Sequence, residues 1–181
     1  RNHSGETADA DNALIIPEDG SATAVVLNHY TPSETTVDLD VVINKTFADE
    51  SVKDRLQGGT FTFAVYKYSV ANPIAEGQLT YAAQEYGTKS VVIENVLGAE
   101  RFTEAGTWSY HVMEQKGSSA NISYDRVVYT FDVVVTDNGG QLEAKVIDTN
   151  NAEIKDTVGD GALDYITQFT NTYDTAPISM D

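Results

Sequence analysis

Hydrophobic and polar residues alternate over most of the chain from residue 37 onward. Such alternation is typical of half-buried β-strands, whose successive side chains point to opposite faces of a sheet. It predicts strands, with turn signals between them, at residues 37–46, 60–68, 78–82, 89–97, 107–115, 126–136, 141–148 and 164–173. Residues 137–140 (Asp-Asn-Gly-Gly) predict a tight hairpin, and residues 47–56 leave room for one short helical turn. Many short strands without alternating helices favour an all-β, immunoglobulin-like antiparallel β-sandwich.

Three polar residues fall on the buried side of this pattern. Lys45 continues the apolar face of the first predicted strand, Glu114 ends that of the fifth, and Asn171 interrupts that of the last. Burying a charge is costly unless the charge is paired or neutralised. One explanation is an ordinary buried Lys45–Glu114 ion pair with Asn171 hydrogen-bonded nearby, and another is that all three residues lie at strand ends in solvent.

A third explanation is a chemical reaction between these side chains. An apolar environment lowers the pKa of Lys45 and raises that of Glu114, because burial favours the neutral form of each group. A neutral amine is a nucleophile, and a protonated Glu114 could donate to the Asn171 carbonyl and carry protons while the amide leaves as ammonia. The resulting amide between Lys45 and Asn171 carries no charge, so the cost of burial disappears. Such a reaction would occur once per molecule, as self-modification rather than enzyme turnover.

Several short segments follow one another in an order that resembles a known family. They are Val-Ile-Asn-Lys at 42–45, Phe-Thr-Phe at 61–63, Gly-Thr-Trp-Ser-Tyr-His-Val-Met-Glu at 106–114, Tyr-Asp at 124–125, Tyr-Thr-Phe-Asp-Val at 129–133 and Phe-Thr-Asn-Thr-Tyr at 169–173. Over residues 36–174 the chain resembles the pilin isopeptide-linkage domain family of Gram-positive surface proteins, best known from the immunoglobulin-like domains of the streptococcal major pilin. The resemblance implies a covalent bond between Lys45 and Asn171 that forms with the help of Glu114. It implies no cofactor and no metal.

Composition excludes several other classes of function. The 181 residues, 41% of them hydrophobic, suit one domain with a sizeable core, and the absence of cysteine excludes disulfides and thiolate metal sites. A formal net charge of -17 argues against binding to nucleic acid or to an anionic membrane surface. No apolar run approaches the roughly 20 residues that a transmembrane helix needs.

The domain organisation expected from the sequence has three parts. Residues 1–34 form an N-terminal tail with one possible extra strand, residues 35–174 the isopeptide-linked domain, and residues 175–181 a C-terminal linker. Asn28-His29-Tyr30 echoes Asn171-Thr172-Tyr173. Residues 13–30 are therefore either an edge strand or tail of this domain, or the last strand of a preceding repeat.

Other candidate sites are weaker. His3, His29 and His111 lack metal-ligand spacing, and the acidic residues of the 156–164 segment do not match an EF-hand loop, so we expect no metal site. Tyr66, Tyr68, Tyr81 and Tyr86, taken as exposed, could form a carbohydrate-binding surface, although tyrosine is also a common strand residue.

These observations predict a structural stalk or spacer module of a Gram-positive adhesin or pilus protein. The module would be extracellular and attached to the cell wall as part of a larger protein, with neighbouring domains of that protein as its partners. A role as the polymerising pilin subunit is not expected, because the approach to the last strand lacks a lysine and residues 175–181 carry no sorting signal. The alternative function is a ligand-binding module that recognises a host protein or glycan through exposed tyrosines and loops.

Overall fold

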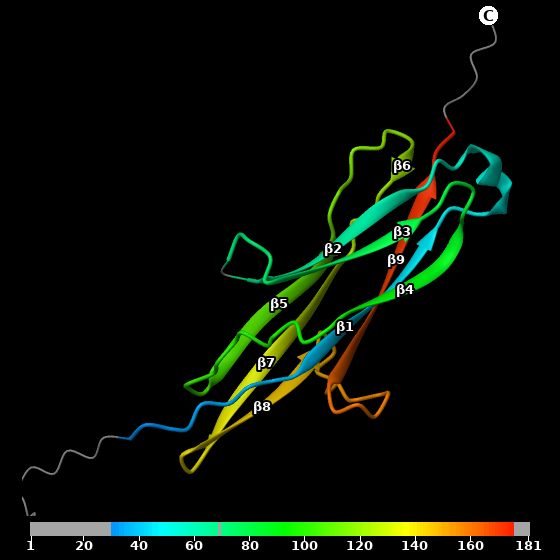
Figure 1. Ribbon diagram of the computed structural model, residues 1–181. Coiled ribbons are helices and arrows are strands. Elements are labelled where there is room, and N and C mark those ends of the chain that lie inside the picture. Colours follow the sequence, from blue (N-terminus) through cyan, green and yellow to red (C-terminus); the bar gives the residue numbers. More distant parts are fainter. Residues whose placement is uncertain (1–29, 69, 176–181) are drawn as a thin grey trace, which may run out of the picture. The chain divides into compact units, whose positions relative to one another are not determined.

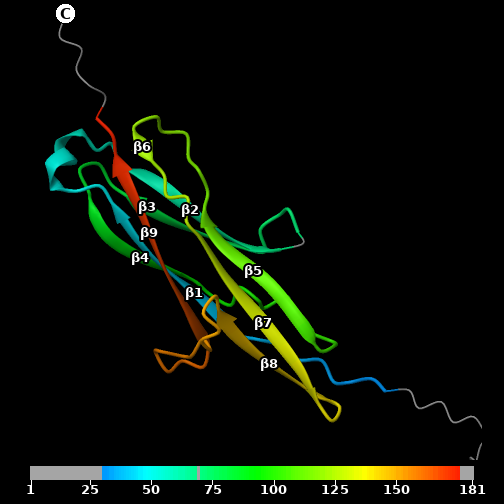
Figure 2. The same ribbon diagram turned by 180° about the vertical axis from the view of Figure 1, so that it is seen from behind.

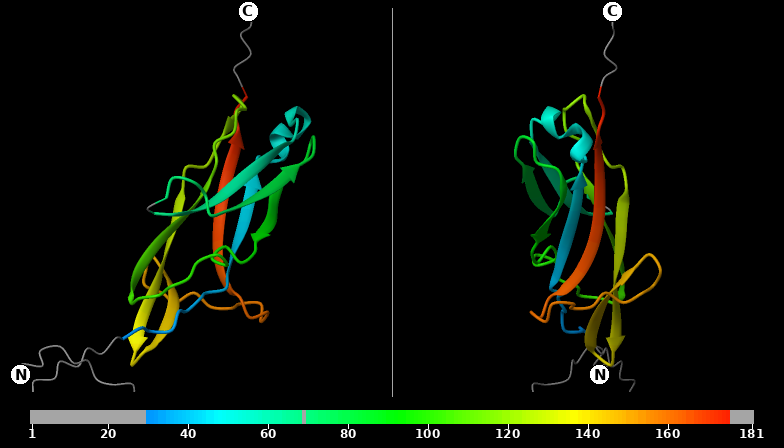
Figure 3. Two further views of the ribbon diagram at one scale, coloured as in Figure 1. Left: turned by 60° about the vertical axis from the view of Figure 1, so that its left-hand side comes forward. Right: turned by 90° about the vertical axis from the view of Figure 1, so that its right-hand side faces the viewer.

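Two β-sheets pack against each other to form the domain (Figures 1 and 3). The computed structural model describes residues 30–68 and 70–175, and the structural statements below concern these residues. The four-stranded sheet has the order β4-β1-β9-β6 and the five-stranded sheet the order β3-β2-β5-β7-β8. The predicted all-β two-sheet sandwich is therefore confirmed.

Nine strands and one short helix make up the described part of the chain. Their bounds are β1 Leu39–Phe47, η1 (a 3-10 helix) Glu50–Arg55, β2 Gly59–Lys67, β3 Ala75–Tyr81, β4 Gly87–Ile93, β5 Gly106–Glu114, β6 Ile122–Ser123, β7 Val128–Asn138, β8 Gln141–Asp148 and β9 Leu163–Tyr173. In these residues no helix is long and apolar enough to cross a membrane.

Each predicted strand overlaps an observed one; β3 begins three residues before its predicted start, at Ala75, and two further places differ. The strand predicted for 89–97 ends at Ile93, because Asn95 adopts a positive φ of 46°, which belongs to a turn and not to an extended strand. The backbone N–H of Asn95 instead donates to the Asp40 side chain at 2.8 Å. The sequence pattern also missed β6, because two residues are too few to show alternation.

The first and last strands of the domain lie side by side and run parallel. β1 and β9 pair along their lengths, from Leu39 opposite Leu163 to Phe47 opposite Asn171. All other pairs between named strands are antiparallel, as predicted. Figures 1 and 2 show the two strands next to each other from opposite sides. The chain thus enters β1 at one end of this strand pair and leaves β9 at the other.

Alternating burial along the strands places one apolar face of each sheet in a common core. β1 alternates buried and half-buried residues over its whole length, and β9 alternates buried and exposed residues from Tyr165 to Thr172. Fully buried members of the core include Leu39, Val41, Ile43, Phe63, Tyr110, Val112, Val133 and Phe169. These two inward faces also carry the three polar residues that the sequence pattern assigned to the core.

The ends of the domain show two further features. Gly139 and Gly140 both have positive φ, as a two-residue hairpin turn between β7 and β8 requires, so the predicted hairpin is confirmed. Ahead of β1, Ser33 pairs with Gln141 and Thr35 with Phe102. The possible strand at 13–30 lies outside the described residues except for Tyr30, as do His3, His29 and residues 176–181.

Candidate functional site

Lys45, Glu114 and Asn171 converge in the core between the two sheets. Their exposed fractions are 0%, 3% and 1%. In the parallel pairing, Lys45 lies opposite Phe169, so Asn171 is the next residue of β9 on the same face. Glu114 is the last residue of β5 and reaches them from the opposite sheet. The structure therefore brings together all three residues that the sequence singled out, and it does not place them at solvent-exposed strand ends.

The Glu114 carboxyl group bridges the other two side chains. The Nζ of Lys45 donates to Oε2 at 2.8 Å, and the Nδ2 of Asn171 donates to Oε1 at 2.7 Å. Each oxygen of one carboxyl group thus holds one of the two nitrogen atoms that an amide exchange would involve. A carboxyl group in this position can take a proton from one nitrogen and give a proton to the other.

Aromatic rings surround the amine and keep water away from it. The Nζ of Lys45 lies 5.0 Å from the ring centre of Phe61 and 5.9 Å from that of Phe63. Phe63 packs in turn on Phe169, with ring centres 5.1 Å apart. Burial lowers the pKa of Lys45 and raises that of Glu114, although the hydrogen bond between them acts in the opposite direction on each. Both shifts favour the neutral amine and the neutral acid that nucleophilic attack requires.

A fourth group contacts the site, and sequence reasoning had given it no role. The backbone N–H of Asp125 donates to the Oδ1 of Asn171 at 2.7 Å. The Tyr124-Asp125 pair belongs to the segments that carry the family resemblance, which was the available signal. Its contribution is a main-chain group, however, and a residue pattern does not show where such a group points.

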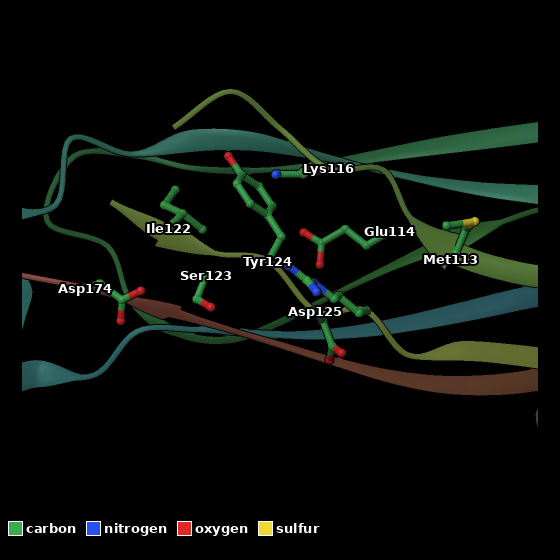
Figure 4. Close-up of a pocket in the computed structure, with 9 residues that line it drawn as sticks. Met113, Glu114, Lys116, Ile122, Ser123, Tyr124, Asp125 and Asp174 are labelled. Carbon is green, nitrogen blue, oxygen red and sulfur yellow. The ribbon is translucent and has the colours of Figure 1, made fainter. Parts of the chain in front are cut away.

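A cavity of about 300 Å³ adjoins the buried carboxyl group (Figure 4). Glu114, Tyr124 and Asp125 line it on the side of the site, and the exposed residues Lys116, Ser123 and Asp174 line it elsewhere. Because exposed residues form part of its wall, the cavity connects Glu114 with the surface. It offers a path by which a small molecule such as ammonia can leave.

The four tyrosines proposed as a binding surface do not share one environment. Tyr81 is only 1% exposed, so its assignment as an exposed residue was wrong. Its ring packs on Phe47 and Phe61, and its hydroxyl group is within hydrogen-bonding distance of the carbonyl oxygens of Lys45 (2.7 Å) and Gly87 (2.8 Å). The signal for its burial was Leu79, which lies two residues earlier on the same face of β3.

The remaining tyrosines lie nearer the surface. Tyr68 is 71% exposed and Tyr86 36%. The half-buried Tyr66 stacks on His111 with ring centres 5.0 Å apart, and Tyr68 meets the same imidazole edge-on at 5.6 Å. Burial lowers the pKa of His111.

The acidic 156–164 segment uses its carboxylates to hold its own loop. Asp156 accepts hydrogen bonds from the backbone N–H groups of Val158, Gly159 and Gly161, and Asp164 accepts from Thr157. Among the described residues, no group of three or more His, Asp or Glu side chains is arranged to hold a metal ion.

Comparison with known protein families agrees with this geometry. The family described as "FctA: Spy0128-like isopeptide containing domain" matches residues 41–174. The chain belongs to this family. It is therefore a pilin-like isopeptide domain of a Gram-positive surface protein, which places it at the bacterial cell surface, and the family is non-enzymatic.

Solved structures with a similar fold include major pilins of Streptococcus pyogenes. The T-13 major pilin aligns with a TM-score of 0.51 and 21% identity, over 81% of this chain and 56% of the pilin. The T3.2 major pilin aligns with a TM-score of 0.49 and 21% identity, over 79% of this chain and 55% of the pilin. A further major pilin structure aligns with a TM-score of 0.48 and 20% identity, over 78% of this chain and 52% of the pilin. The chain spans just over half the length of these proteins. A comparison with curated protein sequences found no match.

Proposed function

We propose that Lys45 and Asn171 form an intramolecular isopeptide bond with the assistance of Glu114. The observation that carries this proposal is the carboxyl group of Glu114, which bridges the Lys45 amine and the Asn171 carboxamide inside an aromatic environment. An ion pair alone would account for the contact with Lys45. The hydrogen bond from the Asn171 carboxamide to the second oxygen is compatible with an unreacted ion pair as well, and the family match over residues 41–174 supports the covalent bond.

The reaction exchanges one amide for another. The neutral Nζ of Lys45 attacks the Cγ of Asn171, and the protonated Glu114 gives its proton to Nδ2. The resulting carboxylate takes a proton from Nζ, the Cγ–Nδ2 bond breaks, and ammonia leaves through the adjoining cavity. The carboxyl group ends in the protonation state in which it began. Because the sheet pairing holds both partners in place, the step gains the effective molarity of an intramolecular reaction.

The bond suits a structural stalk or spacer module attached to the cell wall. It joins the first strand of the domain to the last, and the parallel pairing of these strands puts the chain's entry and exit at opposite ends. Tension along the chain would then pass from β1 to β9 through the bond and bypass the residues between Lys45 and Asn171. Neighbouring domains of the same surface protein are the partners that such a module requires.

The intact mass of the purified chain tests the bond. A linked chain is lighter than its sequence by one ammonia, and Glu114→Ala restores the full mass because no group remains to move the protons. Asp174→Ala, which removes a carboxylate from the same cavity without touching the three side chains, serves as the matched control and should retain the loss. An undegraded wild-type chain of full mass would refute the proposal.

A second candidate function is recognition of a host protein or glycan. The observation in its favour is the aromatic group formed by Tyr66, His111 and Tyr68. Exposed aromatic rings can stack on the apolar faces of sugar rings. A glycan array with the wild type and Tyr68→Ala tests this function, and equal signals from the two proteins would exclude this surface.

A further inference from the structure

The Asn171 carboxamide is held at both of its polar ends. Its Nδ2 donates to Glu114, and its Oδ1 accepts the backbone N–H of Asp125 at 2.7 Å. The side chain is 1% exposed, so neither contact competes with bulk water. The proposed roles of Lys45 and Glu114 include no contact with the carbonyl oxygen Oδ1. Negative charge develops on this oxygen when an amine attacks the amide.

The side chain of Asp125 fixes the position of this N–H. Strand β6 pairs with β9 only at Tyr173 and Thr172, and before these residues the edge of β9 has no strand on that side. There the Asp125 carboxylate, and not a neighbouring strand, accepts a backbone N–H of β9. Its Oδ2 accepts the backbone N–H of Thr170 at 2.7 Å, and its Oδ1 accepts that of Val127 at 2.9 Å. Asp125 is thus attached to β9 at the residue immediately before Asn171.

We infer that the backbone N–H of Asp125 is the oxyanion donor for isopeptide formation and that the Asp125 carboxylate positions it. When Nζ of Lys45 bonds to Cγ, the carbonyl π electrons move onto Oδ1, where this N–H stabilises the charge. When the charge returns to re-form the carbonyl group, the Cγ–Nδ2 bond breaks and ammonia takes the proton from Glu114. A donor fixed by the fold is worth more than one in solution, because it need not reorganise.

Glu114 cannot supply this stabilisation. Both of its oxygens already face nitrogen atoms, one on Lys45 and one on Asn171. An Asp125 carboxylate that faced the oxyanion would repel it. The charge of Asp125 is directed instead toward two backbone N–H groups, so this residue presents its N–H, and not its carboxylate, to the reacting carbonyl.

The inference rests on the proposed bond, and a rate measurement separates the two. Chain made by cell-free synthesis is sampled over time for intact mass, while trypsin resistance in the same samples reports folding. Asp125→Ala should slow the loss of ammonia at least tenfold. Asp125→Asn, which keeps one acceptor oxygen, should lose ammonia at a rate between those of the wild type and Asp125→Ala. Asp174→Ala is the control of equal charge change in the same cavity. The effect of Asp125→Ala on folding alone is measured with Asn171→Ala also present, where no bond can form.

An amide-to-ester replacement tests the N–H itself. Incorporating the α-hydroxy analogue of aspartate at position 125 removes the N–H and keeps the carboxylate, and the same replacement at Arg126 is the control. Loss of one oxyanion donor slows a reaction on the order of 100-fold. We expect the ester at position 125 to slow linkage by this factor and the ester at position 126 to leave the rate unchanged. Linkage at the wild-type rate in the ester at 125 would overturn the inference while leaving the bond intact. A wild-type chain that never loses ammonia would overturn both.

Discussion

Lys45 and Asn171 lie on neighbouring parallel strands, one same-face step apart in the register that pairs Lys45 with Phe169. Diagonal neighbours on one face of a sheet lie within reach of long side chains. The lysine chain therefore spans the step to the carboxamide without any change of strand pairing. Formation of the bond should leave the two sheets as they are.

Loss of the bond should lower the stability of the domain. The bond closes a loop of about 126 residues (171 − 45), and the loop-entropy relation for disulfides gives about 4–5 kcal/mol for a loop of this length. Lys45→Met, which removes the amine and keeps an apolar chain of similar length, should lower the midpoint of thermal unfolding and speed trypsin cleavage. Glu114→Ala should do the same if its lysine stays unlinked. Equal melting and equal cleavage of the variants and the wild type would show that the bond contributes little.

The difference in stability between linked and unlinked protein should shrink at alkaline pH. In Asn171→Ala the Lys45 amine stays free, and burial holds its folded-state pKa below the ordinary value of 10.5. Between these two pKa values the unfolded chain binds more protons than the folded one, so the free energy of unfolding of this variant rises with pH. In the linked protein the same nitrogen is an amide and does not titrate. Burial raises the pKa of Tyr81 to about 12, which destabilises both forms at alkaline pH and cancels in the difference.

Urea unfolding of both proteins from neutral pH to about pH 10 measures this change. The control is the double variant Lys45→Met/Asn171→Ala, which has no amine and should keep a constant difference from the wild type. A difference between wild type and Asn171→Ala that does not narrow would mean that Lys45 is not held below its ordinary pKa.

Mechanical force should not extend the domain while the bond is present. Pulling on the two ends should lengthen Asn171→Ala by about 40 nm, since about 126 residues at roughly 3.5 Å each are released. The wild type should lack this step, because tension passes directly from Lys45 to Asn171. Single-molecule pulling of each protein between identical flanking domains gives the measurement. A step of the same length in the wild type would exclude a load-bearing bond.

Tyr81→Phe should destabilise the domain although the residue lies outside the reacting group. The substitution keeps the ring that packs on Phe47 and removes the hydroxyl group next to the Lys45 and Gly87 carbonyl oxygens. A lost buried hydrogen bond costs about 1–2 kcal/mol. Tyr86→Phe, at the more exposed tyrosine, is the control and should have little effect in the same chemical denaturation experiment. No loss of stability in Tyr81→Phe would show that its hydroxyl group makes no net contribution to the free energy of unfolding.

The sequence by itself determined the fold class and the face on which each site residue lies. Alternation fixes side-chain direction within one strand, so the positions of Lys45, Glu114 and Asn171 in the pattern suffice to assign them to the core. The same rule applied to Leu79 would have placed Tyr81 there too. Local patterns also sufficed for the β7–β8 hairpin, because two consecutive glycines with positive φ define that turn.

Only the tertiary structure decided which strands are neighbours and what the main chain contributes. The alternation of buried and exposed positions gives no information on whether β1 lies beside β9. That pairing joins residues more than a hundred positions apart and depends on how the whole chain crosses between the sheets. The position of the Asp125 N–H next to Asn171 follows from this pairing and from the early end of β6. Every residue except proline carries a backbone N–H, so only its position in the folded chain gives this one a role.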